Sequence, residues 1–155
     1  MRSVLLCLFL VLGSVPCSRA DTLADKCSAL GGKIVDRFEC PQSKLVREER
    51  FCVVQDPKGV VFFNGCTDAI GEYGDVFFEA CFKHDLCYHH EPSFSKKTKE
   101  DCDKQFKENM YSVCAKAHKG FSCKNMARMF YGAVKLKGEK SWNCSDERLD
   151  YRVYR

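Results

Sequence analysis

Cysteine is the residue type that most limits the folds open to this chain, because 12 of its 155 residues are cysteines. Two of them, Cys7 and Cys17, belong to an N-terminal stretch with a positive start, an apolar run and small residues at its end. These features are typical of a signal peptide. We therefore expect residues 1–20 to be cleaved and the protein to be secreted. The rest, residues 21–155, has a length that suits a single domain.

The ten remaining cysteines predict five disulfides, since an even set in a secreted chain usually forms a disulfide framework. No two of them are separated by only two residues, so the spacing of zinc ribbons is absent and a zinc site is disfavoured. The ten are Cys27, Cys40, Cys52, Cys66, Cys81, Cys87, Cys102, Cys114, Cys123 and Cys144.

Helical periodicity predicts a mainly α domain. Apolar residues recur every three or four positions over residues 77–90, 100–118 and 123–136. Gly120 and Gly138 are expected to end the second and the third of these helices.

The segments around the predicted helices are expected to be irregular or extended. Residues 27–63 suggest strands, with a hairpin whose turn is the Pro/Gly-containing stretch 55–59. Residues 89–98 are expected to form the loop between the first two helices. Residues 141–155 are polar and show no clear periodicity.

Basic residues are concentrated in the helical half of the chain. Residues 83–140 contain 13 Lys and Arg against 7 Asp and Glu, within a chain of formal net charge +4. Solvated helix faces explain this excess, and a surface that meets anionic lipid is the alternative. A nucleic-acid partner is disfavoured for an exported chain with so small a net charge.

The densest group of chemically active residue types is the run ACFKHDLCY, residues 80–88. If Cys87 pairs with Cys102 on the next predicted helix, Asp103 can face His84 across the gap. A carboxylate on one imidazole nitrogen fixes the tautomer and leaves the other nitrogen to act as a base.

The pattern CxxHDxCY, followed by Cys-Asp on the next helix, resembles the secreted phospholipase A2 superfamily. The stretches NGCT at 64–67 and FEAC at 78–81, with Cys114 and Cys123 around a short turn, are similar to its bacterial and fungal branch and to the conodipine-like proteins of mollusc venom. The resemblance covers about residues 60–137. It implies a mainly α, disulfide-rich fold with two antiparallel catalytic helices, a third helix and a small N-terminal hairpin.

The resemblance also implies a role for each matching residue. His84 matches the general base that deprotonates a water molecule, and Asp103 matches the carboxylate that orients this histidine. Asp85 matches a calcium ligand, and Asn64 with the backbone carbonyl of Gly65 matches the others. Asn64 stands where some members have aspartate, and an uncharged ligand favours weaker calcium binding.

The resemblance implies the disulfides Cys66–Cys81, Cys87–Cys102 and Cys114–Cys123. Three pairings stay open for the other four cysteines, which are Cys27, Cys40, Cys52 and Cys144.

Each candidate residue has a plainer interpretation. Asp103 can instead form a surface salt bridge with Lys107, and Asn64 with Gly65 can be a simple turn. Asp68 and Asp75 are alternative calcium ligands in the same loop.

Other aromatic residues and histidines are weighed in the same way. The phenylalanines near the motif suit an acyl-chain slot but are more often core; they are Phe62, Phe63, Phe77, Phe78 and Phe82. Trp142 is expected to pack rather than to anchor at a lipid surface, and Tyr88 to hydrogen-bond behind the site. His89, His90 and His118 are expected to be solvated.

The expected function is calcium-dependent hydrolysis of the sn-2 ester of glycerophospholipids at a membrane or micelle surface, which yields a fatty acid and a lysophospholipid. The alternative is a secreted toxin or receptor ligand with weak or no catalysis on the same fold, since a fold does not fix a function.

Overall fold

The computed structural model describes residues 22–67, 72–94, 96–117, 120–146 and 154. The expected signal peptide, together with Asp68 and His118, lies outside these residues. Within them, no helix has both the length and the apolar character that a membrane span requires.

The N-terminal half contains one helix and five short strands. In chain order they are α1 (Thr22–Ala29), β1 (Lys33–Val35), β2 (Phe38–Glu39), β3 (Val46–Arg47), β4 (Phe51–Asp56) and β5 (Gly59–Phe63). Strands β1, β4 and β5 form an antiparallel sheet in that order, and β2 pairs with β3. The predicted hairpin is therefore present as β4 and β5, with Asp56 opposite Gly59.

The C-terminal half is helical. It consists of α2 (Tyr73–Val76), α3 (Phe78–Phe94), α4 (Lys99–Lys116), α5 (Gly120–Lys137) and α6 (Glu139–Trp142). Thr98 begins α4 with a capping box, in which its hydroxyl accepts the N–H of Asp101 and the Asp101 carboxylate accepts the N–H of Thr98.

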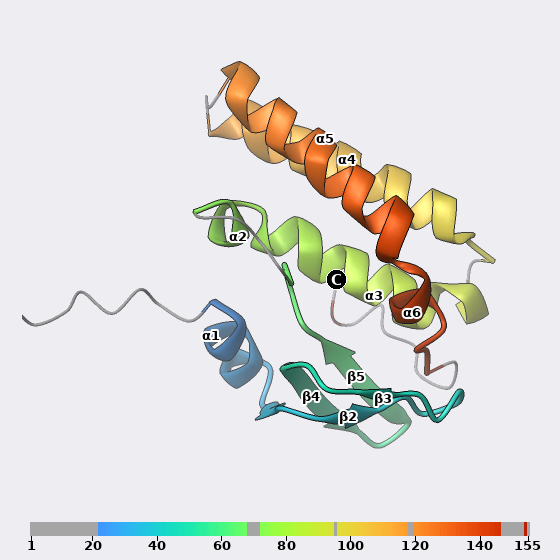
Figure 1. The fold of residues 1–155 in the computed structure, drawn as a ribbon. Coiled ribbons are helices and arrows are strands. Elements are labelled where there is room, and N and C mark those ends of the chain that lie inside the picture. The colour runs from blue at the N-terminus through green and yellow to red at the C-terminus, as the bar shows by residue number, and fades with distance from the viewer. Residues whose placement is uncertain (1–21, 68–71, 95, 118–119, 147–153, 155) are drawn as a thin grey trace, which may run out of the picture.

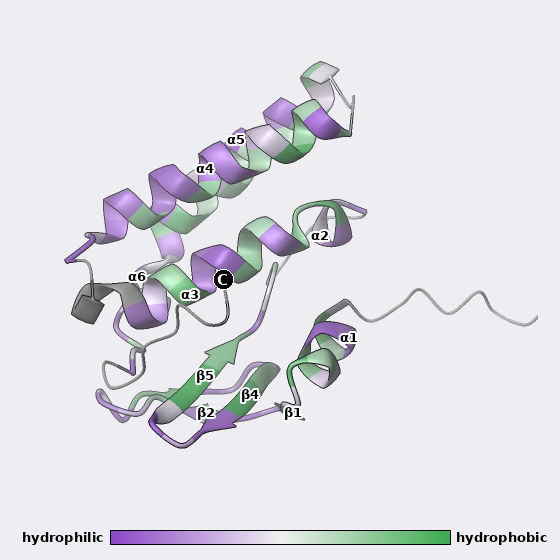
Figure 2. Cartoon of the chain, turned by 180° about the vertical axis from the view of Figure 1, so that it is seen from behind, coloured by the Kyte–Doolittle hydropathy of each residue, from purple (hydrophilic) through white to green (hydrophobic). Residues whose placement is uncertain are grey.

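Helix α3 is the central layer of the molecule, with the pair α4 and α5 on one side and the strands on the other (Figure 1). It is buried on both faces. Phe82 and Leu86 pack with the β4–β5 core, whereas Ala80 and Cys81 pack with Phe106 and the rest of the α4–α5 core. Figure 2 shows β4 and β5 as largely hydrophobic, as strands that pack beneath a buried helix must be. The expected mainly α, disulfide-rich fold is confirmed.

Five disulfides link these layers. Cys66–Cys81, Cys87–Cys102 and Cys114–Cys123 are the three pairs that the resemblance implies. The four cysteines whose pairing stayed open form Cys27–Cys52, which joins α1 to β4, and Cys40–Cys144, which joins the β2 end to the segment after α6.

Several predicted boundaries are wrong. Residues 27–29, expected to be irregular or extended, are the last turn of α1, and α3 continues to Phe94 through more than half of the expected loop at residues 89–98. Pro92 removes one N–H near the end of α3, and the helix ends two residues later instead of before it. Gly120 begins α5 with φ +58° rather than ending α4. Residues 139–142 form α6.

Candidate active site

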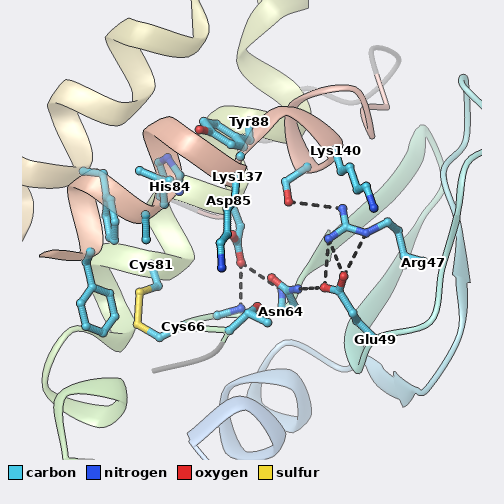
Figure 3. A pocket seen from close by; sticks show the side chains of 18 of the residues that line it. Arg47, Glu49, Asn64, Cys66, Cys81, His84, Asp85, Tyr88, Lys137 and Lys140 are labelled. Atoms are coloured by element: carbon cyan, nitrogen blue, oxygen red, sulfur yellow. Dashed lines mark hydrogen bonds and ion pairs between the residues drawn. A yellow bond between two sulfur atoms is a disulfide. The ribbon is translucent and has the colours of Figure 1, made fainter. Parts of the chain in front are cut away.

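A cavity of about 430 Å³ lies between α3, the loop after β5 and the C-terminal part of α5 (Figure 3). Its polar wall contains Arg47, Glu49, Asn64, His84 and Asp85. Its apolar wall contains Phe106, Met126, Met129, Phe130 and Ala133.

The phenylalanines of the motif region belong to the core instead. None of Phe62, Phe63, Phe77, Phe78 and Phe82 is more than 5% exposed, and none lines this cavity. The core interpretation of these residues therefore holds, and the apolar wall comes from α4 and α5.

His84 and Asp103 face each other across α3 and α4, which the Cys87–Cys102 disulfide joins. His84 Nε2 lies 3.0 Å from Asp103 Oδ1. The other ring nitrogen, Nδ1, has no hydrogen-bond partner among the described residues and belongs to a side chain that lines the cavity. Phe106 stacks on the imidazole with ring centroids 4.5 Å apart. The imidazole is therefore held on two sides, with one nitrogen available for chemistry.

Asp103 is held by more than His84. The Tyr88 hydroxyl donates to Oδ1, and Lys99 Nζ donates to Oδ2 over 3.0 Å. The alternative pairing with Lys107 is absent, since the Lys107 ammonium lies over Tyr131 and Tyr111 instead. Asp103 is therefore buried and fixed by contacts with His84, Tyr88 and Lys99.

The protonation states of this pair suit a general base. Burial lowers the pKa of His84, although the hydrogen bond and the charge of Asp103 oppose this. Burial alone would raise the pKa of Asp103, but hydrogen bonds from His84, Tyr88 and Lys99 hold it below its usual value. At neutral pH the pair is therefore a neutral imidazole beside a carboxylate.

Asp85 occupies the next position on α3 and points to the loop after β5. Its Oδ2 accepts the backbone N–H groups of Gly65 at 2.8 Å and Asn64 at 3.0 Å. Burial raises the pKa of this carboxyl to about 7, although these two N–H groups lower it. A bound cation would therefore stabilise the ionised form of Asp85 and lower its pKa.

Gly65 allows the loop to approach α3 so closely. Its φ is +69°, and an added Cβ would lie 2.7 Å from the Phe78 ring. Asn64 and Gly65 lie outside regular secondary structure, and this backbone conformation places the N–H groups of both residues beside Asp85.

Glu49 and Arg47 are site residues that the sequence did not predict. Asn64 Nδ2 donates to Glu49 Oε2 over 3.1 Å, and Arg47 Nη2 donates to both Glu49 oxygens at 2.9 Å. Both charged residues lie in the charged stretch REER, residues 47–50, well before the motif, where charges are usually solvated. Only the tertiary fold brings them to Asn64, so no local spacing could have revealed them.

Of the two alternative calcium ligands, Asp68 lies outside the described residues and Asp75 lies within them. Asp75 Oδ1 accepts the Thr22 hydroxyl at 2.6 Å and lies outside the main cavity.

Calcium fits the types of oxygen donor found on the residues that line the cavity. These are the Asp85 carboxylate, the Asn64 amide oxygen and the main-chain carbonyl of Gly65, which also accepts the N–H of Thr67 at 3.0 Å; such hard ligands are the ones that calcium prefers. The described residues contain no cluster of three His, Cys, Asp or Glu side chains suited to a metal ion. A calcium ion here would therefore depend on the amide, main-chain and water oxygens as well as on Asp85.

His89 and His90 are buried, contrary to the expectation that they are solvated. They are 1% and 0% exposed, and their Nδ1 atoms bond to the carbonyl groups of Cys144 and Asp146. Trp142 packs edge-on against Tyr88 with centroids 5.5 Å apart, which agrees with a packing role.

Comparison with known proteins agrees with this geometry. A family model described as prokaryotic phospholipase A2 matches residues 47–138, more than half of the chain. The matched region contains Glu49, Asn64, His84, Asp85 and Asp103. No curated protein and no solved structure matches the chain significantly. On the strength of the family model, this chain belongs to the prokaryotic phospholipase A2 family.

Proposed function

We propose that the protein is a secreted, calcium-dependent phospholipase A2 that hydrolyses the sn-2 ester of glycerophospholipids. The observation that carries the proposal is the 3.0 Å contact between His84 Nε2 and Asp103 Oδ1, at the wall of a partly apolar cavity and beside Asp85. Membership in the phospholipase A2 family supports the reaction class.

His84 moves the proton in the proposed reaction. Its Nδ1 takes a proton from a water molecule, whose oxygen attacks the ester carbonyl carbon. The bond from that carbon to the glycerol oxygen then breaks, and the proton passes from Nδ1 to the departing oxygen. Asp103 stabilises the imidazolium between these transfers. The products are a fatty acid and a lysophospholipid, and no serine nucleophile is needed.

Asp85, Asn64 and the Gly65 carbonyl would hold the calcium ion. When bound, calcium polarises the ester carbonyl and stabilises the negative charge that develops on its oxygen. The apolar wall from α4 and α5 suits an acyl chain, because Met126, Met129 and Phe130 line the cavity with apolar side chains.

The proposal is tested by fatty-acid release from phospholipid mixed micelles, first with calcium and then with EDTA. We expect release that requires calcium. His84→Gln should lower the turnover rate by about a hundredfold to ten-thousandfold, because it removes the base. Lys83→Gln is the matched control, since Lys83 is an exposed neighbour that does not line the cavity.

Two results would contradict the proposal. Turnover by His84→Gln at the wild-type rate would exclude the mechanism. A correctly folded protein with five disulfides that releases no fatty acid would favour the alternative function, a secreted toxin or receptor ligand.

A further inference from the structure

We propose that the outer face of α5 is the surface by which this protein binds an anionic lipid membrane. This proposal extends the proposed function, and it rests on that function because it assumes that the active site lies in the cavity beside α5. Three exposed apolar side chains, Phe121, Met129 and Leu136, define what we call the α5 ridge.

The α5 ridge is unusual in its exposure. Phe121 is 77%, Met129 58% and Leu136 86% exposed. Among the described residues, Val46 on β3 is the one other exposed large hydrophobic side chain, at 38%. Three such side chains on one helix have a cost in water that contact with hydrocarbon would remove.

Helical geometry places the α5 ridge on one side of the helix. At 100° per residue its three members fall within an arc of about 80°, and they span roughly 22 Å along the axis. Cys123 and Ala127 point the opposite way into the core, where both are fully buried. Helix α5 lies at the outside of the molecule in both views (Figures 1 and 2).

The charge of α5 indicates the chemical class of the partner that binds the ridge. The helix contains no acidic residue and four basic ones, Lys124, Arg128, Lys135 and Lys137. The first three lie along one edge of the ridge by the same geometry. Two copies of such a helix would repel each other, which disfavours self-association through this face. A soluble anionic polymer would pair with the basic side chains but leave the apolar ridge in water. An anionic lipid surface can pair with the basic side chains and also bury the ridge in hydrocarbon.

The opposite edge of the ridge leads into the cavity. Met129 is both exposed and part of the apolar wall, and Met126, Phe130 and Ala133 continue that wall. A membrane in contact with the ridge would thus have the apolar wall beside it, so that an acyl chain could enter without crossing water.

The experiment measures binding to phosphatidylglycerol vesicles by sedimentation in EDTA, so that no hydrolysis takes place. Leu136→Asp is compared with Val46→Asp, which makes the same charge change on β3, on the opposite side of the molecule in Figure 1. We expect the apparent Kd to rise by about tenfold or more for Leu136→Asp, and by less than about twofold for Val46→Asp. Binding should weaken at high salt and be weaker on phosphatidylcholine vesicles.

The outcomes separate this inference from the proposed function. Equal loss of binding in both variants, or binding of Leu136→Asp at the wild-type Kd, overturns the α5 surface. Equal binding to neutral and anionic vesicles overturns its anionic preference. Vesicle binding through α5 by a wild-type protein that hydrolyses no lipid supports the surface and contradicts the enzyme. Folding of each variant is checked by its melting temperature.

Discussion

At the scale of single residues, Glu49 joins parts of the site that the CxxHD motif does not contain. Its Oε2 accepts the Asn64 amide N–H, which leaves the amide oxygen for the cavity side. Its two oxygens also bind Arg47, which would otherwise present an unpaired guanidinium near Asp85. Figure 3 shows Asn64 between Asp85 and Glu49. Glu49 thus both orients a proposed calcium ligand and neutralises a charge that would repel calcium.

Glu49→Ala should therefore weaken calcium binding by about tenfold to a hundredfold, the usual effect of removing a group that orients a metal ligand. Titration calorimetry with calcium alone measures this without reference to activity. Glu48→Ala is the matched control, because Glu48 is 71% exposed and pairs with Arg37 outside the cavity. An unchanged calcium affinity in Glu49→Ala would show that Asn64 is oriented by other means.

The site residues that the sequence predicts are those that belong to the cysteine-containing motif or adjoin its disulfide partner. His84 and Asp85 are adjacent on one helix, and the Cys87–Cys102 disulfide fixes Asp103 opposite His84. Glu49 is 15 residues before its partner Asn64 and reaches it only because of the fold. A contact of that kind leaves no periodic signal in the sequence.

At the scale of elements, the turn between α5 and α6 packs tightly against Tyr88. A Cβ on Gly138 would be 2.5 Å from the Val134 carbonyl oxygen and 2.6 Å from the Tyr88 hydroxyl. That hydroxyl donates to Asp103. By contrast, a Cβ on Gly132 in the middle of α5 would meet no atom within 4 Å. Replacement by alanine is therefore expected to have opposite effects on stability at Gly138 and at Gly132.

Gly138→Ala should lower the free energy of unfolding by about 1–3 kcal/mol, the usual cost of overpacking a filled site. Gly132→Ala should raise it by about 0.5–1 kcal/mol, because alanine is the better helix former. Denaturant unfolding with the disulfides intact measures both. If Gly138→Ala were as stable as Gly132→Ala, the close packing of α6 on Tyr88 would be wrong.

The long helices were predictable because α4 and α5 each have one buried face and a clear period. The end of α3 was not, since a proline usually predicts a helix stop and α3 nevertheless continues two residues past Pro92. Helix α1 has only eight residues and one fully buried side chain, Cys27, so it has almost no apolar period to detect.

At the scale of the whole molecule, the segment after α6 connects the two halves of the fold. Cys144 bonds to Cys40, which lies 104 residues earlier. Asp146 donates its N–H to the His89 carbonyl and accepts the N–H of Val60 on β5. The sequence could not assign the Cys40–Cys144 pair, because ring closure over such a distance depends on the complete fold.

His89 and His90 extend these connections and make them sensitive to pH. Each ring donates through Nδ1 to a carbonyl of the C-terminal segment, at Cys144 and Asp146. Burial lowers the pKa of both histidines; the charges of His90 and Arg47 also lower that of His89, whereas the hydrogen bonds oppose the shift. The folded protein therefore keeps both rings neutral at a pH where the unfolded chain protonates them.

The sign of the effect follows from this difference. Below the ordinary histidine pKa of about 6.5 the unfolded state binds more protons than the folded state, so stability falls as the pH falls. Each histidine contributes at most about 1.4 kcal/mol per pH unit to this loss. We expect the unfolding free energy, measured by denaturant at pH 7.5 and pH 5.0, to decrease more in the wild type than in the His89→Gln/His90→Gln variant. The exposed carboxylates are the same in both proteins, so the difference between the two decreases isolates the histidines. An equal decrease in both would show that the two rings are already protonated in the fold, and that the C-terminal segment is not held by neutral imidazoles.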